Sequence, residues 1–427
     1  MSEALLRTIP PGEIPPTRRD VFDCETLRRA AEIVDDVRAR GEPALREYAT
    51  RFDRLDPSEP IVRTGPELAA ACEGLASVQR ELLNRTAARI RRFAEAQRAS
   101  VRELRLEIPG GAAGHSILPV KTAGCYAPGG RYPLVSSMLM TVVTARAAGV
   151  ECVWAASPQP SQIMLAAAAI AGADAVLAVG GAHAVAALAY GVGPVPSCDV
   201  IVGPGNTWVT AAKHLVSSRT RIDVLAGPSE LLILADRHAD PALIASDLLA
   251  QAEHDVNARP MLVTTHPPLV DAVNGELRQQ LRTLPTRKTA EAALSNGFAV
   301  AAGDLGQAVE LCDQIAPEHL ALHVMDPDHV ARRVRNYGSL FIGSQSAEVF
   351  GDYGAGPNHT LPTGGMARSQ SGLSVLNFLR FPTWLRINDR DAASSIHDDS
   401  ESLARLEGLE AHARSASIRA RKPPNPE

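Results

Sequence analysis

Short apolar segments alternate with Ala-rich segments of helical pattern from about residue 120 onward, and this alternation limits the possible folds more than any other feature. Each short segment is followed by a turn signal, which is typical of parallel strands joined by helices. The first block of expected strands covers residues 122–126, 151–155, 175–179 and 200–202. A second block begins near residue 230, with expected strands at 231–235, 261–265, 299–301 and 340–342. The sequence therefore predicts an α/β protein with two α/β lobes.

The two ends of the chain have a different pattern. The first 20 residues hold four prolines and are interpreted as an arm. Residues 24–100 are predicted to be helical, because 25–40 and 65–98 carry apolar side chains at helical spacing. Beyond about residue 374 we expect helix again, followed by a loose tail. A length of 427 residues agrees with two to three domains.

Composition excludes several classes of partner. The chain has 43 basic and 48 acidic residues, a net charge of -5, and therefore offers no basic surface for nucleic acid. Glycine turns interrupt the apolar stretch 163–193, so it predicts a buried helix, strand and helix instead of a membrane span. The N-terminus has no secretory pattern, and six scattered cysteines without a C-x-x-C motif indicate reduced thiols. We therefore expect a cytoplasmic protein that binds neither nucleic acid nor membrane.

Three glycine-rich turns, at residues 128–130, 180–181 and 203–206, follow expected strands of the first block. Glycines at such positions let a ligand approach the backbone, and the N-terminus of the following helix favours a phosphate. No G-x-G-x-x-G fingerprint follows a strand, however. Ordinary strand-to-helix turns are therefore an equally good interpretation.

Several side chains able to bind a metal lie on helical patterns. Gln251 and His254 are three residues apart and would share one helix face, with Asp247 one turn earlier. An imidazole with oxygen ligands suits zinc. Near the C-terminus, Glu407 and His412 also lie on a helical pattern. A solvated helix face is the alternative interpretation for each of these residues.

Two further segments carry polar side chains without a packing role. Glu318 and His319 are adjacent in APEHL, which we interpret as a loop. A carboxylate and a histidine are the usual general-base candidates. The segment 351–365 is rich in glycine, is predicted to be irregular, and holds Asp352 and His359. Polar residues on an ordered loop favour a functional role.

Taken together and in chain order, these segments resemble the histidinol dehydrogenase family. The strongest match is IDVLAGPSELLILADRHADPALIASDLLAQAEH at residues 222–254. PEHL, GDYGAGPNHTLPT and EAHARSASIR match three further motifs of that family. YAPGG, GPGN and the GGA turn match its nucleotide-binding half. The resemblance runs from about residue 20 to about residue 419.

The resemblance implies a two-step oxidation of the small-molecule alcohol L-histidinol to L-histidine through an enzyme-held aldehyde, with NAD as oxidant and one Zn²⁺ per site. It implies that His319 takes the alcohol proton and that Glu318 acts as a base toward water. The implied zinc ligands are Gln251, His254, Asp352 and His412 of the partner subunit. The implied substrate-binding residues are Ser229, His359 and Glu407, and the implied NAD-binding residues are Tyr126, His183 and Asn206.

The resemblance also implies the architecture. We expect two incomplete Rossmann-like lobes, one inserted in the other, in a domain-swapped homodimer with a shared active site. The expected parts are an N-terminal arm (1–19), a discontinuous metal-binding and catalytic domain (20–121 with 229–373), an NAD-binding domain (122–228) and a C-terminal helical swapped segment (374–427).

Three alternatives stay open. His183 and Ala94 depart from the family pattern, and GHSILPV and GGRYPL are similar to a paralogous branch that oxidises other primary alcohols, including sulfonated diols. The positions of the histidinol type are Ser229, Pro317 and Tyr353. A non-catalytic relative that binds nucleotide or metal is the second alternative. The third is a thiohemiacetal on Cys125 or Cys152 during aldehyde oxidation.

Overall fold

The computed structural model describes residues 4–16, 21–129 and 133–420. Gly130 of one glycine-rich turn, and parts of the expected arm and tail, lie outside the described residues. The chain divides into two compact units. The first consists of Met1–Gln97 with Val120–Phe378, and the second of Arg98–Pro119 with Leu379–Glu427.

The first unit contains a six-stranded sheet in the order β1-β7-β6-β5-β8-β9. Its strands are β1 (Val62–Arg63), β5 (Thr122–Tyr126), β6 (Cys152–Ala156), β7 (Ala175–Leu177), β8 (Val200–Val202) and β9 (Arg221–Ile222). The connecting helices are α5 (Val135–Ala148), α6 (Gln162–Ala171), α7 (Gly181–Tyr190) and α8 (Thr207–Val216). All pairs are parallel except β1 with β7. The expected strands of the first block are thus confirmed, and so is the helix, strand and helix in the apolar stretch.

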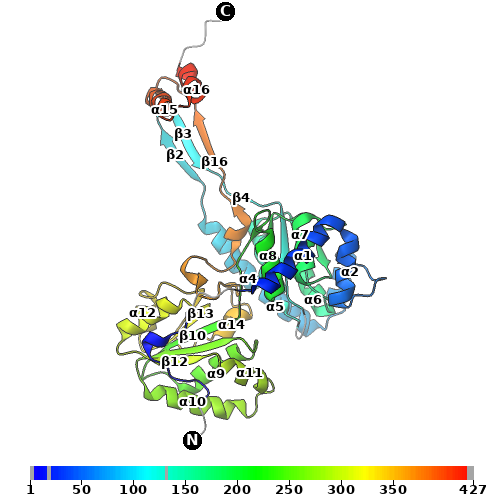
Figure 1. The fold of residues 1–427 in the computed structure, drawn as a ribbon, viewed down its shortest axis with the longest axis vertical. Helices are drawn as coiled ribbons and strands as arrows, with labels where there is room; N and C mark the ends of the chain where they lie inside the picture. The colour runs from blue at the N-terminus through cyan, green and yellow to red at the C-terminus, as the bar shows by residue number, and fades with distance from the viewer. Residues whose placement is uncertain (1–3, 17–20, 130–132, 421–427) are drawn as a thin grey trace, which may run out of the picture. The chain divides into compact units, whose positions relative to one another are not determined.

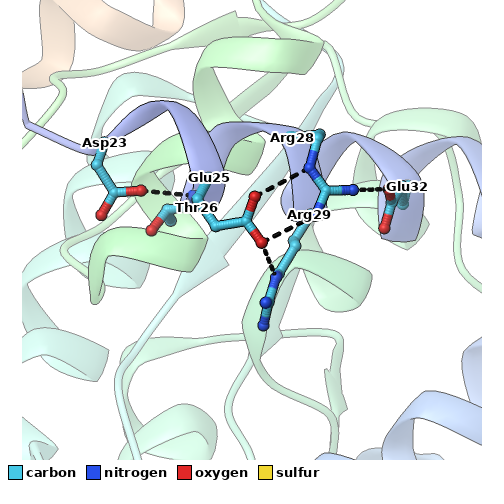
Figure 2. A network of polar contacts seen from close by, with 6 residues as sticks. All are labelled: Asp23, Glu25, Thr26, Arg28, Arg29 and Glu32. Atoms are coloured by element: carbon cyan, nitrogen blue, oxygen red, sulfur yellow. Dashed lines mark hydrogen bonds and ion pairs between the residues drawn. The ribbon is translucent and has the colours of Figure 1, made fainter.

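Four helices precede β5, the first parallel strand of this sheet: α1 (Cys24–Arg40), α2 (Glu42–Asp53), α3 (Gly65–Glu73) and α4 (Ser77–Ser100). The single helix expected over 65–98 is two helices, with a break at Gly74. Helix α1 packs on α7 and α8, and it begins where the Asp23 carboxylate caps it by accepting from the Thr26 N–H at 2.6 Å (Figure 2). Glu25 then pairs with Arg28 and Arg29 on the solvent side of the first turns.

A five-stranded parallel sheet, in the order β12-β11-β10-β13-β14, forms the second half of the first unit (Figure 1). Its strands are β10 (Glu230–Ala235), β11 (Arg259–Thr264), β12 (Phe298–Ala301), β13 (His319–His323) and β14 (Ser339–Ile342). Its helices are α9 (Pro241–Ala252), α10 (Pro268–Leu281), α11 (Arg287–Leu294), α12 (Leu305–Ile315), α13 (Pro327–Ala331) and α14 (Glu348–Asp352).

The interpretation of APEHL as a loop holds for residues 316–318 and is wrong for His319 and Leu320. His319 begins β13, because it and the four residues that follow are buried and pair in parallel with both β10 and β14. The N-terminal segment also contributes to this sheet. Leu6 is fully buried and hydrogen-bonded to Asn274, and the Ile9 N–H donates to the Ala299 carbonyl at 2.9 Å beside β12.

The two sheets have the same topology. When the parallel strands of each are numbered along the chain, both have the order 3-2-1-4-5. The direction of winding therefore changes beside β5 in one sheet and beside β10 in the other. Doubly wound sheets bind ligands outside the carboxyl ends of their strands at such a change.

The second unit is a three-stranded antiparallel sheet with a pair of helices at one end of it (Figure 1). Its elements are β2 (Leu104–Ile108), β3 (Gly111–His115), β4 (Leu118–Pro119), β15 (Leu379–Arg380), β16 (Thr383–Ile387), α15 (Ser394–Leu406) and α16 (Glu410–Ala420). The expectation of helix from about residue 374 was incomplete, because β15 and β16 come first and pair with β4 and β3.

Three short 3₁₀ helices belong to the first unit: η1 (Pro11–Glu13), η2 (Met366–Arg368) and η3 (Val375–Phe378).

No helix in the described part of the chain combines the length and the apolar character needed to cross a membrane.

Candidate active site

The carboxylate of Glu318 and the imidazole of His319 are both held by the main chain of Glu230. The Glu230 N–H donates to Glu318 Oε2 at 2.8 Å, and His319 Nδ1 donates to the Glu230 carbonyl at 3.1 Å. Because Nδ1 carries the proton in this bond, Nε2 of His319 is free to accept one. The pair lies at the amino ends of β10 and β13, the edge opposite to the one where parallel sheets usually bind ligands.

A buried ion pair supports this arrangement. Arg259 Nη1 lies 3.1 Å from Glu230 Oε1, and both side chains are almost fully buried. Glu230 Oε2 also accepts from the Gly364 N–H at 3.2 Å. Burial raises the pKa of Glu230, against the effect of the Arg259 charge and these hydrogen bonds. The first residue of β10, whose main chain orients Glu318 and His319, is therefore held in place by its ion pair with Arg259 and its hydrogen bond from Gly364.

Burial also separates the protonation behaviour of the two candidate bases. It raises the pKa of Glu318 well above the usual range, and the nearby carboxylates of Glu230, Asp352 and Glu348 add to the rise. It lowers the pKa of His319 to about 4, so the imidazole is neutral at physiological pH. A neutral imidazole with a free Nε2 can accept a proton.

Three side chains with metal-ligand atoms converge beside this pair. Donor atoms of His254, Glu348 and Asp352 all lie within 4.8 Å of one another. His254 Nε2 is 3.4 Å from Asp352 Oδ2, and this contact raises the pKa of His254. Burial alone would raise the pKa of Asp352, but the hydrogen bond with His254 and the nearby imidazoles of His319 and His359 lower it overall. The group joins the end of α9 to α14.

Gln251, on the last turn of α9, is a second sign of a ligand site. Its side chain is completely buried, and neither amide atom has a hydrogen-bond partner within the part of the chain that the structure describes. Buried polar atoms in native proteins are normally paired, and an unpaired one calls for a bound group. The interpretation of Gln251 as a surface residue is therefore wrong. His254 lies two residues past the end of α9 and is exposed, while Asp247 pairs instead with His323, at 3.4 Å.

Glu348 is a site residue that the sequence analysis missed. The glycines of residues 351–365 indicated irregular backbone, which concealed the fact that Asp352 is the last residue of α14. Glu348 is four residues earlier and therefore shares its helix face with Asp352. The i, i+4 spacing of two acids in EVFGD was the available signal.

A cavity of about 400 Å³ opens beside these groups and is lined by His319, Asp352 and His359, among others. His359 Nδ1 donates to the Asp352 carbonyl at 3.1 Å, which leaves its Nε2 to accept from the Ser137 hydroxyl at 3.1 Å. Burial lowers the pKa of His359. None of the described residues that line this cavity is a Lys or an Arg. It is therefore suited to a neutral or cationic ligand.

The other expected substrate residues lie apart in sequence. Ser229 directly precedes β10, and its carbonyl accepts from the Arg259 N–H at 2.9 Å. Glu407 and His412 belong to the second unit, where both line a depression of about 810 Å³. They do not share one helix as expected, because Glu407 caps α15, Gly408 follows with a φ of 75°, and His412 lies in α16.

A second cavity in the first unit, of about 790 Å³, is lined by the three expected NAD-binding residues Tyr126, His183 and Asn206. It lies where β5, β7 and β8 end, which is the carboxyl edge of the six-stranded sheet beside its change of winding. The Tyr126 hydroxyl accepts from the Gly181 N–H at 3.1 Å, and the Asn206 carboxamide oxygen caps α8. The structure thus brings these three residues together at the edge where such sheets bind ligands.

Asp53 organises one wall of this cavity and was not foreseen. Its Oδ2 accepts from the Gly180 N–H at 2.8 Å and lies 3.0 Å from His183 Nε2. The rings of Tyr48 and Phe52 flank the buried His183 at 5.9 and 6.0 Å between centroids. His183 is therefore a packed wall residue.

The rim of the cavity carries a charged network and strained backbone. Arg29 and Glu32 line the cavity from α1, where Glu25 pairs with Arg29 (Figure 2). Arg54 and Gln159, also in the lining, have φ angles of 55° and 43°. Non-glycine residues in this conformation tend to gather at ligand sites.

The cysteines do not support a thiohemiacetal. Burial raises the pKa of Cys125 to about 12, and the pKa of Cys152 is also raised, mainly by burial. Both therefore stay as thiols at neutral pH, whereas the thiolate is the nucleophile. All six cysteines are free, as expected.

Parallel α/β sheets with a buried acid–base pair beside converging metal-ligand side chains define the class of this protein: it is an α/β enzyme. The chain belongs to the histidinol dehydrogenase family, whose model matches residues 17–420. Members of this family are oxidoreductases.

Three relatives illustrate the match. Histidinol dehydrogenase from Dechloromonas aromatica is 40% identical over 399 residues, which cover 92% of each chain. Sulfopropanediol 3-dehydrogenase from Ruegeria pomeroyi is 38% identical over 415 residues, covering 95% of this chain and 94% of the relative. The crystal structure of histidinol dehydrogenase from Elizabethkingia anophelis superposes with a TM-score of 0.91 at 29% identity, covering 98% of this chain and 99% of that one.

Proposed function

We propose that this chain is a zinc- and NAD-dependent histidinol dehydrogenase, which oxidises L-histidinol to L-histidine in two steps. The observation that carries the proposal is that His254 meets Asp352 beside a cavity lined by Asp352 and His319, with no Lys or Arg among its described lining residues. An amino alcohol with an imidazole ring is compatible with this acidic surrounding. The sulfonate of a sulfonated diol is anionic and would be repelled there.

The donor set fits a divalent metal. Gln251, His254 and Asp352 supply nitrogen and oxygen ligands, and the unpaired, fully buried amide of Gln251 is accounted for by metal ligation. His412 of the partner subunit would complete the set. Bound Zn²⁺ would supply Lewis-acid attachment for the imidazole and amino nitrogens of the substrate.

The residues around the 400 Å³ cavity support a stepwise proton path. His319 Nε2 takes the proton of the substrate hydroxyl while hydride leaves the carbinol carbon. Glu318 then acts as base toward the water that adds to the aldehyde, and His319 accepts the second alcohol proton. Ser229, His359 and Glu407 would hold the substrate. The balance is one alcohol, one water and two NAD⁺ giving one carboxylate, two NADH and three H⁺.

NAD would occupy the 790 Å³ cavity and supply the hydride acceptor for both steps. Its position at the carboxyl edge of the six-stranded sheet, next to the N-termini of α7 and α8, supports this assignment. Tyr126, His183 and Asn206 would contact it. The shared 3-2-1-4-5 order supports two incomplete Rossmann-like lobes, one inserted in the other.

We further propose a homodimer in which the second unit reaches the site of a second copy. The second unit exposes many large apolar side chains for its size, among them Leu106, Leu385, Leu406 and Ile418, each at least 60% exposed. Apolar groups gathered in this way favour a protein interface. Removal of residues 400–427 would then abolish activity.

The deciding experiment is NADH formation from L-histidinol by purified protein loaded with zinc, with NADH counted per substrate consumed. Two NADH per histidinol are expected. Turnover of a sulfonated diol without turnover of histidinol would move the assignment to the paralogous activity. No NADH from any amino alcohol or diol would favour a non-catalytic relative, and loss of NADH formation in His319→Gln with retained ligand binding would support an enzyme.

A further inference from the structure

Lys213 and Asp223 form a buried ion pair that the proposed reaction does not use. Lys213 lies on α8, Asp223 follows β9, and their side chains are 3% and 0% exposed. Taking two charges out of water is repaid only when additional hydrogen bonds satisfy their remaining polar atoms. The partners of those hydrogen bonds therefore indicate what the pair holds in place.

Both members of the pair hold Gly203, the first residue after β8. The Gly203 N–H donates to Asp223 Oδ2 at 2.7 Å, and Lys213 Nζ donates to the Gly203 carbonyl at 3.0 Å. Nζ has two further acceptors, which are Asp223 Oδ1 and the Val224 carbonyl. All three ammonium protons are therefore used, and both backbone polar groups of Gly203 are fixed.

Gly203 in turn lies directly against the expected dinucleotide site. Its φ of 115° is in the region that favours glycine, and a Cβ added there would lie 2.0 Å from the Tyr126 carbonyl oxygen. Three residues later, the Asn206 carboxamide oxygen caps α8. Tyr126 and Asn206 both line the 790 Å³ cavity. The backbone at Gly203 therefore connects two residues that face this cavity.

We propose that Lys213, through its pair with Asp223, is a positioning residue for the dinucleotide: it holds the turn at residues 203–206 in the geometry that binds NAD. This inference rests on the NAD site of the proposed function. Lys213 is buried and is not among the described residues that line the cavity, so it acts through the turn and not by touching the cofactor. Loss of the pair weakens NAD binding and leaves the metal site unchanged.

NAD binding without turnover tests this, by calorimetric titration of the zinc-loaded, full-length protein with NAD. The variants are Lys213→Met and a double variant that adds Asp223→Leu, which leaves no uncompensated buried carboxylate and tests the pair even if Lys213→Met does not fold. We expect each to bind NAD about tenfold or more weakly, because the turn is no longer held in place. The KM for NAD should rise by the same factor, whereas zinc affinity, the KM for L-histidinol and kcat at saturating NAD should stay close to the wild-type values.

Arg146→Met separates positioning from general stability. Arg146 also combines an ion pair, with Asp174 at 2.7 Å, and a hydrogen bond to a main-chain carbonyl, that of Gly172 at 2.7 Å. It lies at the opposite, amino edge of the same sheet, because Asp174 directly precedes β7. Arg146→Met should therefore lower Tm, as Lys213→Met does, and keep NAD affinity. Lys288→Met, at an exposed position of α11, should change neither.

Gly203→Ala gives an independent reading with both charges intact. Its Cβ would meet the Tyr126 carbonyl, so it should weaken NAD binding to a similar extent. Full NAD affinity in Gly203→Ala, or in the folded Lys213 variants, would overturn the inference and leave the proposed NAD site standing. An equal loss in Arg146→Met would also overturn it, because general destabilisation would then explain both losses. A wild-type chain that binds no NAD would overturn both this inference and the proposed NAD site.

Discussion

The carboxylate of Glu318 accepts a hydrogen bond from the backbone N–H of Glu230 at 2.8 Å. This bond occupies Oε2 and leaves Oε1 as the basic oxygen. We expect Glu318→Gln to lower kcat by about 10²–10⁴, the usual contribution of a general base. The loss should be largest when the aldehyde is supplied directly, because only that step needs an activated water. NADH formation from alcohol and from aldehyde would be compared, with Glu310→Gln as control. Equal losses in both reactions would contradict a role restricted to water.

The pH dependence of activity follows from the same carboxyl group. Burial raises the pKa of Glu318, so its basic form appears at higher pH than that of an ordinary carboxyl group, and raising the pH increases that form. Because burial lowers the pKa of His319 to about 4, His319 is already neutral, and its titration does not change kcat near pH 7. We expect kcat for the aldehyde to rise with pH across the neutral range in the wild type and to be flat in Glu318→Gln. If kcat of the variant also rose with pH, a group other than Glu318 would be responsible for the pH dependence.

The buried pair of Glu230 and Arg259 should be essential for stability. Arg259→Met leaves the carboxylate of Glu230 buried without its cation, and breaking such a pair costs about 3–5 kcal/mol. Urea unfolding would measure the loss. Arg287→Met is the matched control, because Arg287 pairs with Glu291 on the surface of α11, where an ion pair contributes less than about 1 kcal/mol. Equal stability of the two variants would show that Glu230 is not charged in the folded protein.

Asp53 should act on dinucleotide binding and not on chemistry. Asp53→Ala removes the acceptor that holds the Gly180 N–H and His183 in the wall of the 790 Å³ cavity. We expect the KM for NAD to rise about tenfold, because one charge-assisted hydrogen bond is lost. The kcat should be nearly unchanged. Quenching of Trp208, which lines this cavity, would report NAD binding without turnover. The exposed Asp56→Ala is the control. A change in kcat alone would exclude this role.

Cys125 should be chemically silent. Since burial raises the pKa of its thiol to about 12, raising the pH from 7 to 9 leaves it protonated. Iodoacetamide at pH 8 should therefore leave Cys125 unmodified in the folded protein, and Cys125→Ala should retain activity. Peptide mass analysis after labelling would measure the modification. An inactive Cys125→Ala variant that folds normally would restore the thiohemiacetal alternative.

The sequence by itself determined the strand–helix alternation and most of its bounds. Short runs such as 200–202 and 231–235 are apolar over their whole length because both faces of a parallel sheet are buried, and that composition is local information. The start of α9 also depends on local residues alone, because the Asp240 side chain caps the helix and Pro241 occupies its first position. The motifs at residues 222–254 also pointed to the family.

Tertiary structure decided the strand pairings and side-chain contacts between residues that are distant in sequence. His319 begins a strand, not a loop, because its partners β10 and β14 are distant in sequence. β16 and β3 pair across a separation of more than 260 residues, which no local pattern encodes. Asp53 reaches His183, and Glu348 reaches His254, for the same reason. Burial, which shifts the pKa of Glu318 and His319 in opposite directions, exists only once the chain has folded around them.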